Sequence, residues 1–259
     1  MDSRVSSFHS RVAMDRVREE MQFIRDELDG FERFEERVEP LSSVPQAQSG
    51  TPMGGGVLTA PSSASPAQKL KHTYQSTVMA VPHYEAEYGD SFEESVRTEF
   101  DEPLCQVLLG RVTFTPLAKS RLIGASENAR HNRSELLDDL ERELAELRGA
   151  IDRFEKWITE LERIRRRVTR WNDCEASIEL ARIERLNEEC DALSSKRQRH
   201  LHRRSRTICH HREPDSFAQY LYQGTPFTMP ILADISVVGE RLDDERDRIR
   251  RRLTGGHNG

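Results

Sequence analysis

The feature that most constrains this chain is a seven-residue repeat of apolar side chains between Leu137 and Val168. Its first position holds Leu137, Leu144, Ile151, Ile158 and Arg165, and its fourth holds Leu140, Leu147, Phe154, Leu161 and Val168. Nine of these ten side chains are apolar, a pattern typical of a coiled-coil seam. Ala150, Trp157 and Ile164 widen the stripe, which favours three or four packed helices over an isolated two-stranded coil.

Two further helices are predicted to pack on this one. After a turn at 171–173, Ile183, Leu186, Cys190 and Leu193 continue the spacing of three and four residues, and Arg197 takes the next position. The short connection predicts an antiparallel partner. A short aromatic segment follows at 217–222. After a turn at 224–230, a last helix presents the apolar side chains of Ile231, Ile235, Val238, Leu242, Ile249 and Leu253.

The first 39 residues predict a separate amphipathic helix. Its apolar stripe consists of Val17, Met21, Ile24, Leu28, Phe31 and Val38, and Pro40 stops it. Residues 40–68 contain no charged side chain but many Pro, Gly and Ser residues, which predicts a flexible linker.

Residues 69–112 predict three short helices, broken near Pro82 and Glu102. Ser91 and Glu94 match a capping box, and Asp101 followed by Pro103 suits another helix start. We therefore expect an all-α protein. Its expected parts are a helix at 1–39, a linker at 40–68, and an elongated antiparallel bundle, or coiled-coil hairpin with short capping helices, at 69–255.

Composition agrees with a helical protein of the cytoplasm. Hydrophobic residues make up 36% and charged residues 32% of 259 positions, and the net charge of -6 points to no polyanionic partner for the whole chain. The four cysteines lie far apart, without a C-x-x-C pair, which suits reduced thiols. We see neither a signal peptide nor an apolar run near the ~20 residues of a membrane span.

The most distinctive local feature is a basic run from Lys196 to Arg212, with seven basic residues, four histidines and no acid. Such a run could bind phosphates, and Arg199, Arg203, Arg204 and Arg206 are the candidate nucleic-acid-binding residues. The favoured alternative is a basic surface paired with acidic neighbours, such as those at 138–146, which the antiparallel geometry brings close.

Neither a metal site nor a catalytic site is predicted. Cys209, His210 and His211, with His200 and His202, lack the i,i+4 ligand spacing of a helical metal site, and arginines would repel a cation. His83, Tyr84, Glu85, Glu87 and Tyr88 could form an acid–base cluster, but the sequence shows neither a positioned partner nor a pocket. We expect no cofactor.

Several segments together resemble a family of uncharacterised haloarchaeal proteins. In chain order they are 31–34 (FERF) with Arg37 and Val38, 77–84 (TVMAVPHY) with Glu87 and Tyr88, 190–193 (CDAL) with 197–199 (RQR), and 220–222 (YLY) with 230–232 (PIL). The resemblance implies a haloarchaeal, cytoplasmic setting and brings no reaction, cofactor or catalytic residue.

The sequence therefore leaves the function unknown and favours a structural or protein-interaction helical module over an enzyme. It would act on a protein partner, or by self-association, through coiled-coil contacts. The alternative is a nucleic-acid-binding accessory protein that uses the segment 196–212. No membrane or small-molecule partner is expected.

Overall fold

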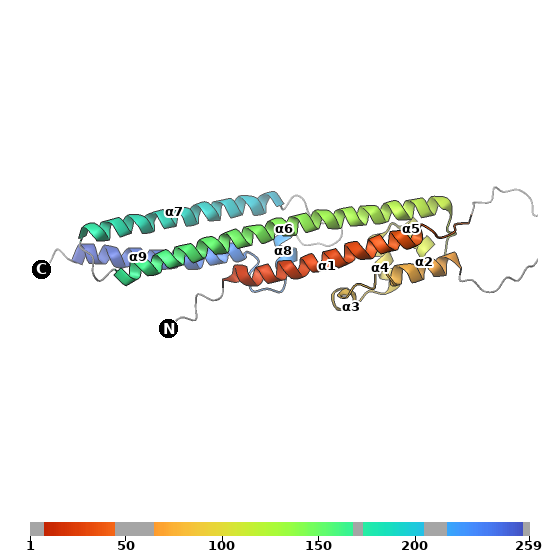
Figure 1. Ribbon diagram of the computed structural model, residues 1–259, viewed down its shortest axis with the longest axis horizontal. Helices are drawn as coiled ribbons and strands as arrows, with labels where there is room; N and C mark the ends of the chain where they lie inside the picture. The colour runs from red at the N-terminus through yellow and green to blue at the C-terminus, as the bar shows by residue number, and fades with distance from the viewer. Residues whose placement is uncertain (1–7, 45–64, 168–172, 205–216, 256–259) are drawn as a thin grey trace, which may run out of the picture. The chain divides into compact units, whose positions relative to one another are not determined.

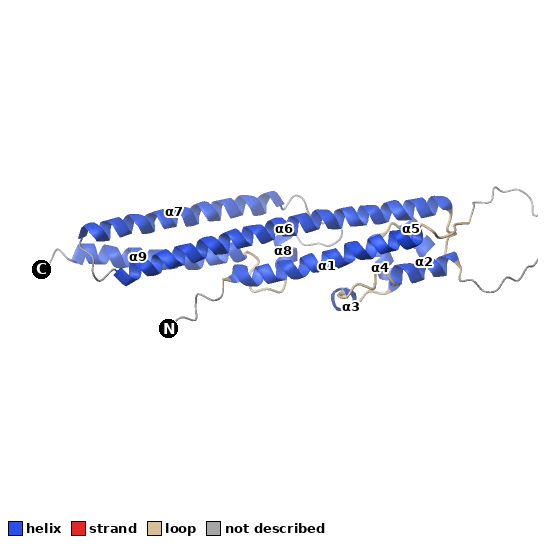
Figure 2. Ribbon diagram, in the orientation of Figure 1, coloured by secondary structure: helices blue, strands red, loops and turns tan. Residues whose placement is uncertain are grey.

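A computed structural model describes residues 8–44, 65–167, 173–204 and 217–255. These residues form nine helices and no strand, which confirms the prediction of an all-α fold (Figures 1 and 2). In chain order the helices are α1 (His9–Val38), α2 (Pro66–Gln75), α3 (Tyr84–Glu87), α4 (Phe92–Glu99), α5 (Glu102–Leu108), α6 (Pro116–Arg167), α7 (Asp173–Arg204), α8 (Phe217–Tyr222) and α9 (Pro230–Gly255). None of the helices in these ranges has the length and apolar content needed to cross a lipid bilayer.

The chain divides into two compact units. Unit 1 consists of Met1–Glu20 and Glu141–Gly259, and unit 2 of Met21–Leu140. Both α1 and α6 contribute residues to each unit. The predicted division at 1–39, 40–68 and 69–255 stays a prediction.

In unit 1, the C-terminal part of α6 packs against α7 with opposite chain direction. Positions that rise along α6 pair with positions that fall along α7, because Glu143 bonds to Arg197 and Trp157 bonds to Glu189. Helix α9 packs along α7 (Figure 1). The predicted seam supplies the core of this unit, where Leu147, Phe154 and the neighbouring stripe residues are buried.

The ends of the predicted seam are less buried than its centre. Leu137 is half-buried and Arg165 is exposed, whereas every stripe residue from Leu140 to Leu161 is buried. The widening residues Ala150, Trp157 and Ile164 are buried as well, as the broad stripe predicted. Val168 and the predicted turn residues 171 and 172 lie outside the described residues.

Unit 2 contains four short helices, α2 to α5, rather than the three predicted. They surround an aromatic core in which Tyr74 contacts Phe34, Phe92 and Phe100 at ring-centroid distances of 5.5–6.0 Å. The extra element, α3, is a single turn at Tyr84–Glu87 that follows Pro82. It was missed because one turn carries no periodic signal of its own.

Most predicted helix starts are confirmed in detail. Ser91 and Glu94 form the capping box, and Asp101 accepts from the Leu104 N–H. At the start of α6, Thr115 accepts from the Ala118 N–H in the same way. Ser65 and Gln68 form a second capping box, and α2 begins at Pro66, within the range predicted as a linker. Residues 45–64 of that linker lie outside the described residues.

Helix α1 is more regular than its sequence suggested. Besides Met21 and Gly30, its buried positions alternate in steps of three and four residues: Ser10, Ala13, Val17, Glu20, Ile24, Glu27, Phe31, Phe34 and Val38. The predicted stripe did not include Glu20, Glu27 or Phe34. Since a buried carboxylate needs hydrogen-bonding partners, these glutamates mark the places where polar groups meet inside the fold.

Candidate functional site

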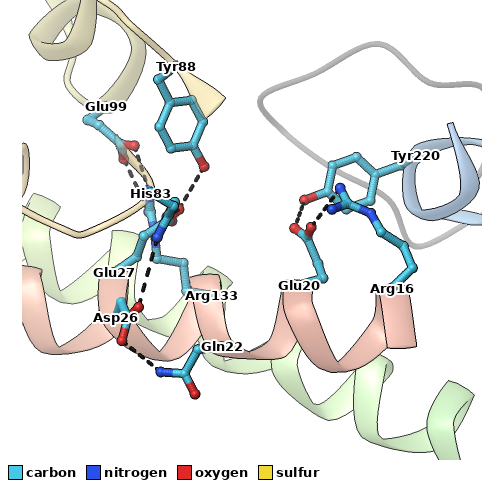
Figure 3. Close-up of polar contacts among 10 residues, drawn as sticks. All are labelled: Arg16, Glu20, Gln22, Asp26, Glu27, His83, Tyr88, Glu99, Arg133 and Tyr220. Carbon is cyan, nitrogen blue, oxygen red and sulfur yellow. Dashed lines mark hydrogen bonds and ion pairs between the residues drawn. The ribbon is translucent and has the colours of Figure 1, made fainter. Parts of the chain in front are cut away.

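A buried polar cluster of unit 2 centres on Glu27 of α1 (Figure 3). Its Oε1 accepts hydrogen bonds from the Tyr88 hydroxyl at 2.7 Å and His83 Nε2 at 3.1 Å, and its Oε2 accepts from Arg133 Nε at 2.7 Å. The guanidinium of Arg133 also binds Glu99 through both terminal nitrogens, at 2.6 and 3.2 Å. The cluster therefore links α1, α4 and α6 to the chain around α3.

Electrostatics keep the Glu27 carboxylate charged despite its burial. Burial raises the pKa of Glu27, but the Arg133 charge and the hydrogen bonds from Tyr88, Arg133 and His83 outweigh it and lower the pKa below its ordinary value. Burial likewise opposes the charge of Arg133, yet the carboxylates of Glu99 and Glu27 raise the pKa of the guanidinium. Glu27 and Arg133 therefore both stay charged, and each offsets the charge of the other.

His83 takes a defined orientation in this cluster. An ionised carboxylate only accepts hydrogen bonds, so Nε2 of His83 carries the proton that bonds to Glu27. The imidazole stacks on Phe23 at 4.2 Å, and its Nδ1 lies 3.9 Å from an Asp26 oxygen. Phe23 thus holds the plane of the ring that the Glu27 contact orients.

The suggested acid–base cluster at 83–88 is thus assembled in part. His83 and Tyr88 converge on Glu27, a partner that lies 56 and 61 positions away in sequence. Glu85 and Glu87 are exposed, and Tyr84 is buried with no hydrogen bond to its hydroxyl among the described residues. Glu27 could have been identified from the sequence, because it lies at the same three- and four-residue spacing as the buried apolar positions of α1.

In unit 1, two α1 side chains meet residues from the end of the chain. Asp234 of α9 accepts from the His9 and Ser10 N–H groups at 2.8 Å each and from the Ser10 hydroxyl at 2.6 Å. Glu20 accepts from Tyr220 of α8 and from Arg16 (Figure 3). These contacts join α1 to α8 and α9.

Unit 1 has a buried ion cluster of its own, which involves the start of the predicted basic run. Arg197, 3% exposed, bonds to Glu143 at 2.5 and 3.0 Å and to Glu146 at 2.8 Å, and Tyr222 donates to Glu143 at 2.7 Å. His200 Nδ1 lies 3.1 Å from Glu146. Burial lowers the pKa of Arg197, but Glu143, Tyr222 and Glu146 together raise it. Arg197 and His200 of the basic run are thus paired with acids of α6, the kind of pairing that the favoured alternative predicted.

Ligand atoms of Glu143, Glu146 and His200 lie within 4.8 Å of one another, the one such grouping among the described residues. Both carboxylates, however, already bond to the Arg197 guanidinium. A cation would have to displace this buried charge, so the donor set fits arginine better than a metal.

The predicted nucleic-acid-binding residues are not brought together by the described structure. Arg199 is exposed on α7, whereas the side chains of Arg203 and Arg204 and the whole of Arg206 lie outside what is described. His202, Cys209, His210 and His211 lie outside it too.

A groove of about 750 Å³ runs between α6 and α7 of unit 1. Its apolar lining residues are Trp157, Leu186, Ala192 and Leu193. Its cations are Arg153, Lys156, Lys196 and Arg199, and its acids are Glu160 and Glu189. We call the four cations the basic rim. Trp157 is oriented by a 2.8 Å hydrogen bond from its indole Nε1 to Glu189.

Comparison with known proteins identifies a family but no activity. A family described as "Domain of unknown function (DUF7260)" matches residues 9–246. No curated protein matches the chain, and no solved structure does.

Proposed function

The chain belongs to the DUF7260 family, whose function is unknown, and from its geometry we propose that it is a structural or protein-interaction helical module. It acts through helix–helix contacts, and the groove between α6 and α7 receives a helix of its partner. The observation that carries the proposal is this groove, because its apolar side chains and basic rim lie along two antiparallel helices.

The dimensions of the groove suit a helix. Along α7 its lining residues extend from Leu186 to Arg199. At ~1.5 Å per residue this is about 20 Å, or three to four turns of a docked helix. Ala192 is exposed and small, so a third helix could approach the α7 backbone closely there.

The buried charges support a non-catalytic role. Glu27 and Glu143 each accept from an arginine and a tyrosine of this chain, so their lone pairs hold helices together. Buried polar groups at heptad positions are well suited to fixing the register of helix packing. We assign the protein no reaction and no cofactor.

The proposal places the protein in the cytoplasm of a haloarchaeal cell. The family resemblance of segments such as 77–84 supports this setting, as do the free thiols of Cys105, Cys174 and Cys190. The alternative of a nucleic-acid-binding protein loses support, because Arg197 of the basic run is buried against Glu143 and Glu146.

The test is to block the groove and measure association. Ala192→Trp fills it, and Ala181→Trp, at an exposed position of α7 that does not line it, is the matched control. Light scattering detects self-association, and affinity capture from the source cells detects another partner.

The proposal expects association in the parent and in Ala181→Trp, and its loss in Ala192→Trp. The proposal would be contradicted if the parent and both variants were monomers that capture no other protein. It would also be contradicted if Ala192→Trp bound the partner as well as the parent does.

A further inference from the structure

Besides its apolar lining, the groove has an excess of positive charge, because four cations but only two acids line it. Building on the proposed function, we infer that its partner presents an amphipathic helix with Asp or Glu side chains beside the apolar stripe. The basic rim receives these carboxylates, and the stripe packs on Leu186 and Ala192, the apolar lining residues that are not buried in the core of unit 1.

The basic rim stands out because its members lack acidic partners. Elsewhere on the same two helices, Arg163 pairs with Glu160 at 2.6 Å and Arg182 pairs with Glu179 at 3.0 Å. None of the four rim cations forms an ion pair or hydrogen bond with any residue that the structure describes. Their charge is available to a ligand.

The spacing of the rim matches a helix laid along the groove. Arg153 and Lys156 lie three residues apart on α6, and Lys196 and Arg199 lie three apart on α7. Residues three apart share a helix face, so each pair points to the same side of its helix. The bonds of Glu143 to Arg197 and of Trp157 to Glu189 set the register of the two helices, so Lys196 and Arg199 mark one end of the groove, whereas the α6 pair lies nearer the level of Glu189.

The groove also carries two acids, Glu160 and Glu189, and both are engaged. Glu160 bonds to Arg163, and Glu189 accepts the indole N–H of Trp157. The unpaired charges of the groove are therefore its four rim cations. Such an excess of positive charge selects the kind of helix that docks.

An acidic helix fits these features better than a nucleic acid does. Phosphates would satisfy the rim, but they would leave the partly exposed Leu186 and the exposed Ala192 without an apolar partner and would approach Glu160 and Glu189. A second copy of the groove also fits poorly, because it would bring four more cations and only two more acids.

The experiment uses the full chain with Trp171→Phe, so that Trp157 is its one tryptophan. The probe is a labelled synthetic peptide of about 15 residues, with Leu at heptad positions and Glu on both flanks, long enough to fill the groove. A second peptide has Gln in place of every Glu. Peptide anisotropy and Trp157 fluorescence report binding.

We expect the Glu peptide to bind, to change Trp157 fluorescence, and to bind at least about tenfold more tightly than the Gln peptide. Lys196→Glu/Arg199→Glu and, independently, Arg153→Glu/Lys156→Glu weaken it at least about tenfold. Arg148→Glu/Arg185→Glu makes the same charge change at exposed positions of the same helices outside the groove and leaves binding unchanged. Circular dichroism verifies that each variant is folded.

The outcomes separate this inference from the proposed function. Equal binding of both peptides overturns the acidic partner and leaves a helix-binding groove. Binding of neither peptide, together with association that Ala192→Trp abolishes, also overturns only the inference. Oligonucleotide binding lost in Lys196→Glu/Arg199→Glu, or a dimer lost in the same variant, would assign the rim to a nucleic acid or to a second copy and overturn it.

Discussion

Asp234 caps the amino terminus of α1 by accepting both the N–H and the hydroxyl of Ser10, which lies 224 positions earlier in the chain. Its other carboxylate oxygen accepts the N–H of His9. The first N–H groups of a helix have no partner within the helix, and a negative charge there is favourable. Helix α1 thus takes its cap from α9 rather than from a neighbouring residue.

The cap predicts a measurable loss of stability. Asp234→Ala leaves three donors, two of them buried, without an acceptor and should lower the free energy of unfolding by about 1–2 kcal/mol. Hydrogen exchange should accelerate first at His9 and Ser10. Asp244→Ala, an exposed position on the same helix, is the control for denaturant unfolding. Equal stability of the two variants would show that the cap contributes nothing.

The ion cluster of unit 2 should be sensitive to loss of its cation. Arg133→Met leaves Glu27 and Glu99 without their shared partner, and removing one member of a buried pair costs about 3–5 kcal/mol. Arg121→Met removes an exposed pair with Asp101 and should cost less than about 1 kcal/mol. Urea unfolding distinguishes the two, and similar losses for both would count against a structural role for the cluster.

The lowered pKa of Glu27 predicts acid sensitivity. Because the folded pKa lies below the ordinary 4.5, the charged carboxylate stabilises the fold fully above pH 4.5, and this contribution is lost as pH falls through the folded pKa. Glu27→Gln should therefore be less stable near neutrality and show a shallower fall in stability in acid. Glu85→Gln, exposed in the same unit, should follow the parent; a parent-like slope in Glu27→Gln would refute the assignment.

Thiol reactivity reports on the packing of α7. Burial raises the pKa of Cys190 to about 12, with Asp191 and Glu189 adding to the shift, whereas Cys174 is exposed. In a Cys209→Ser background, a thiol reagent at pH 8 should modify one cysteine rapidly, and Cys174→Ser should abolish that phase. Cys105 and Cys190 should react only on unfolding; rapid modification of Cys190 would contradict its burial.

The helices could be predicted because apolar periodicity and caps are local signals. The seam at Leu144–Leu161 and the capping box of Ser91 required no knowledge of distant residues. The pairing of Arg197 with acids of α6 was also within reach, because Arg197 continues an apolar stripe and the antiparallel geometry places it near 138–146.

The polar clusters could not be predicted in the same way. Glu20 and Glu27 occupy heptad positions, but charged residues normally face water, and their burial depends on Tyr220 and on His83, Tyr88 and Arg133, which are remote in sequence. The groove depends on which cations the fold leaves without acids, and that follows only from the side-chain arrangement of two packed helices.

We propose that a partner helix docks between α6 and α7. A photoreactive amino acid placed at Ala192, inside the groove, and separately at Arg148, outside it, tests the claim directly in the source cells. Mass spectrometry of the crosslinked products should find, at position 192, a single partner joined through an amphipathic acidic helix, and no such product at position 148. Crosslinks at 148 but not at 192, or the same products at both, would contradict it.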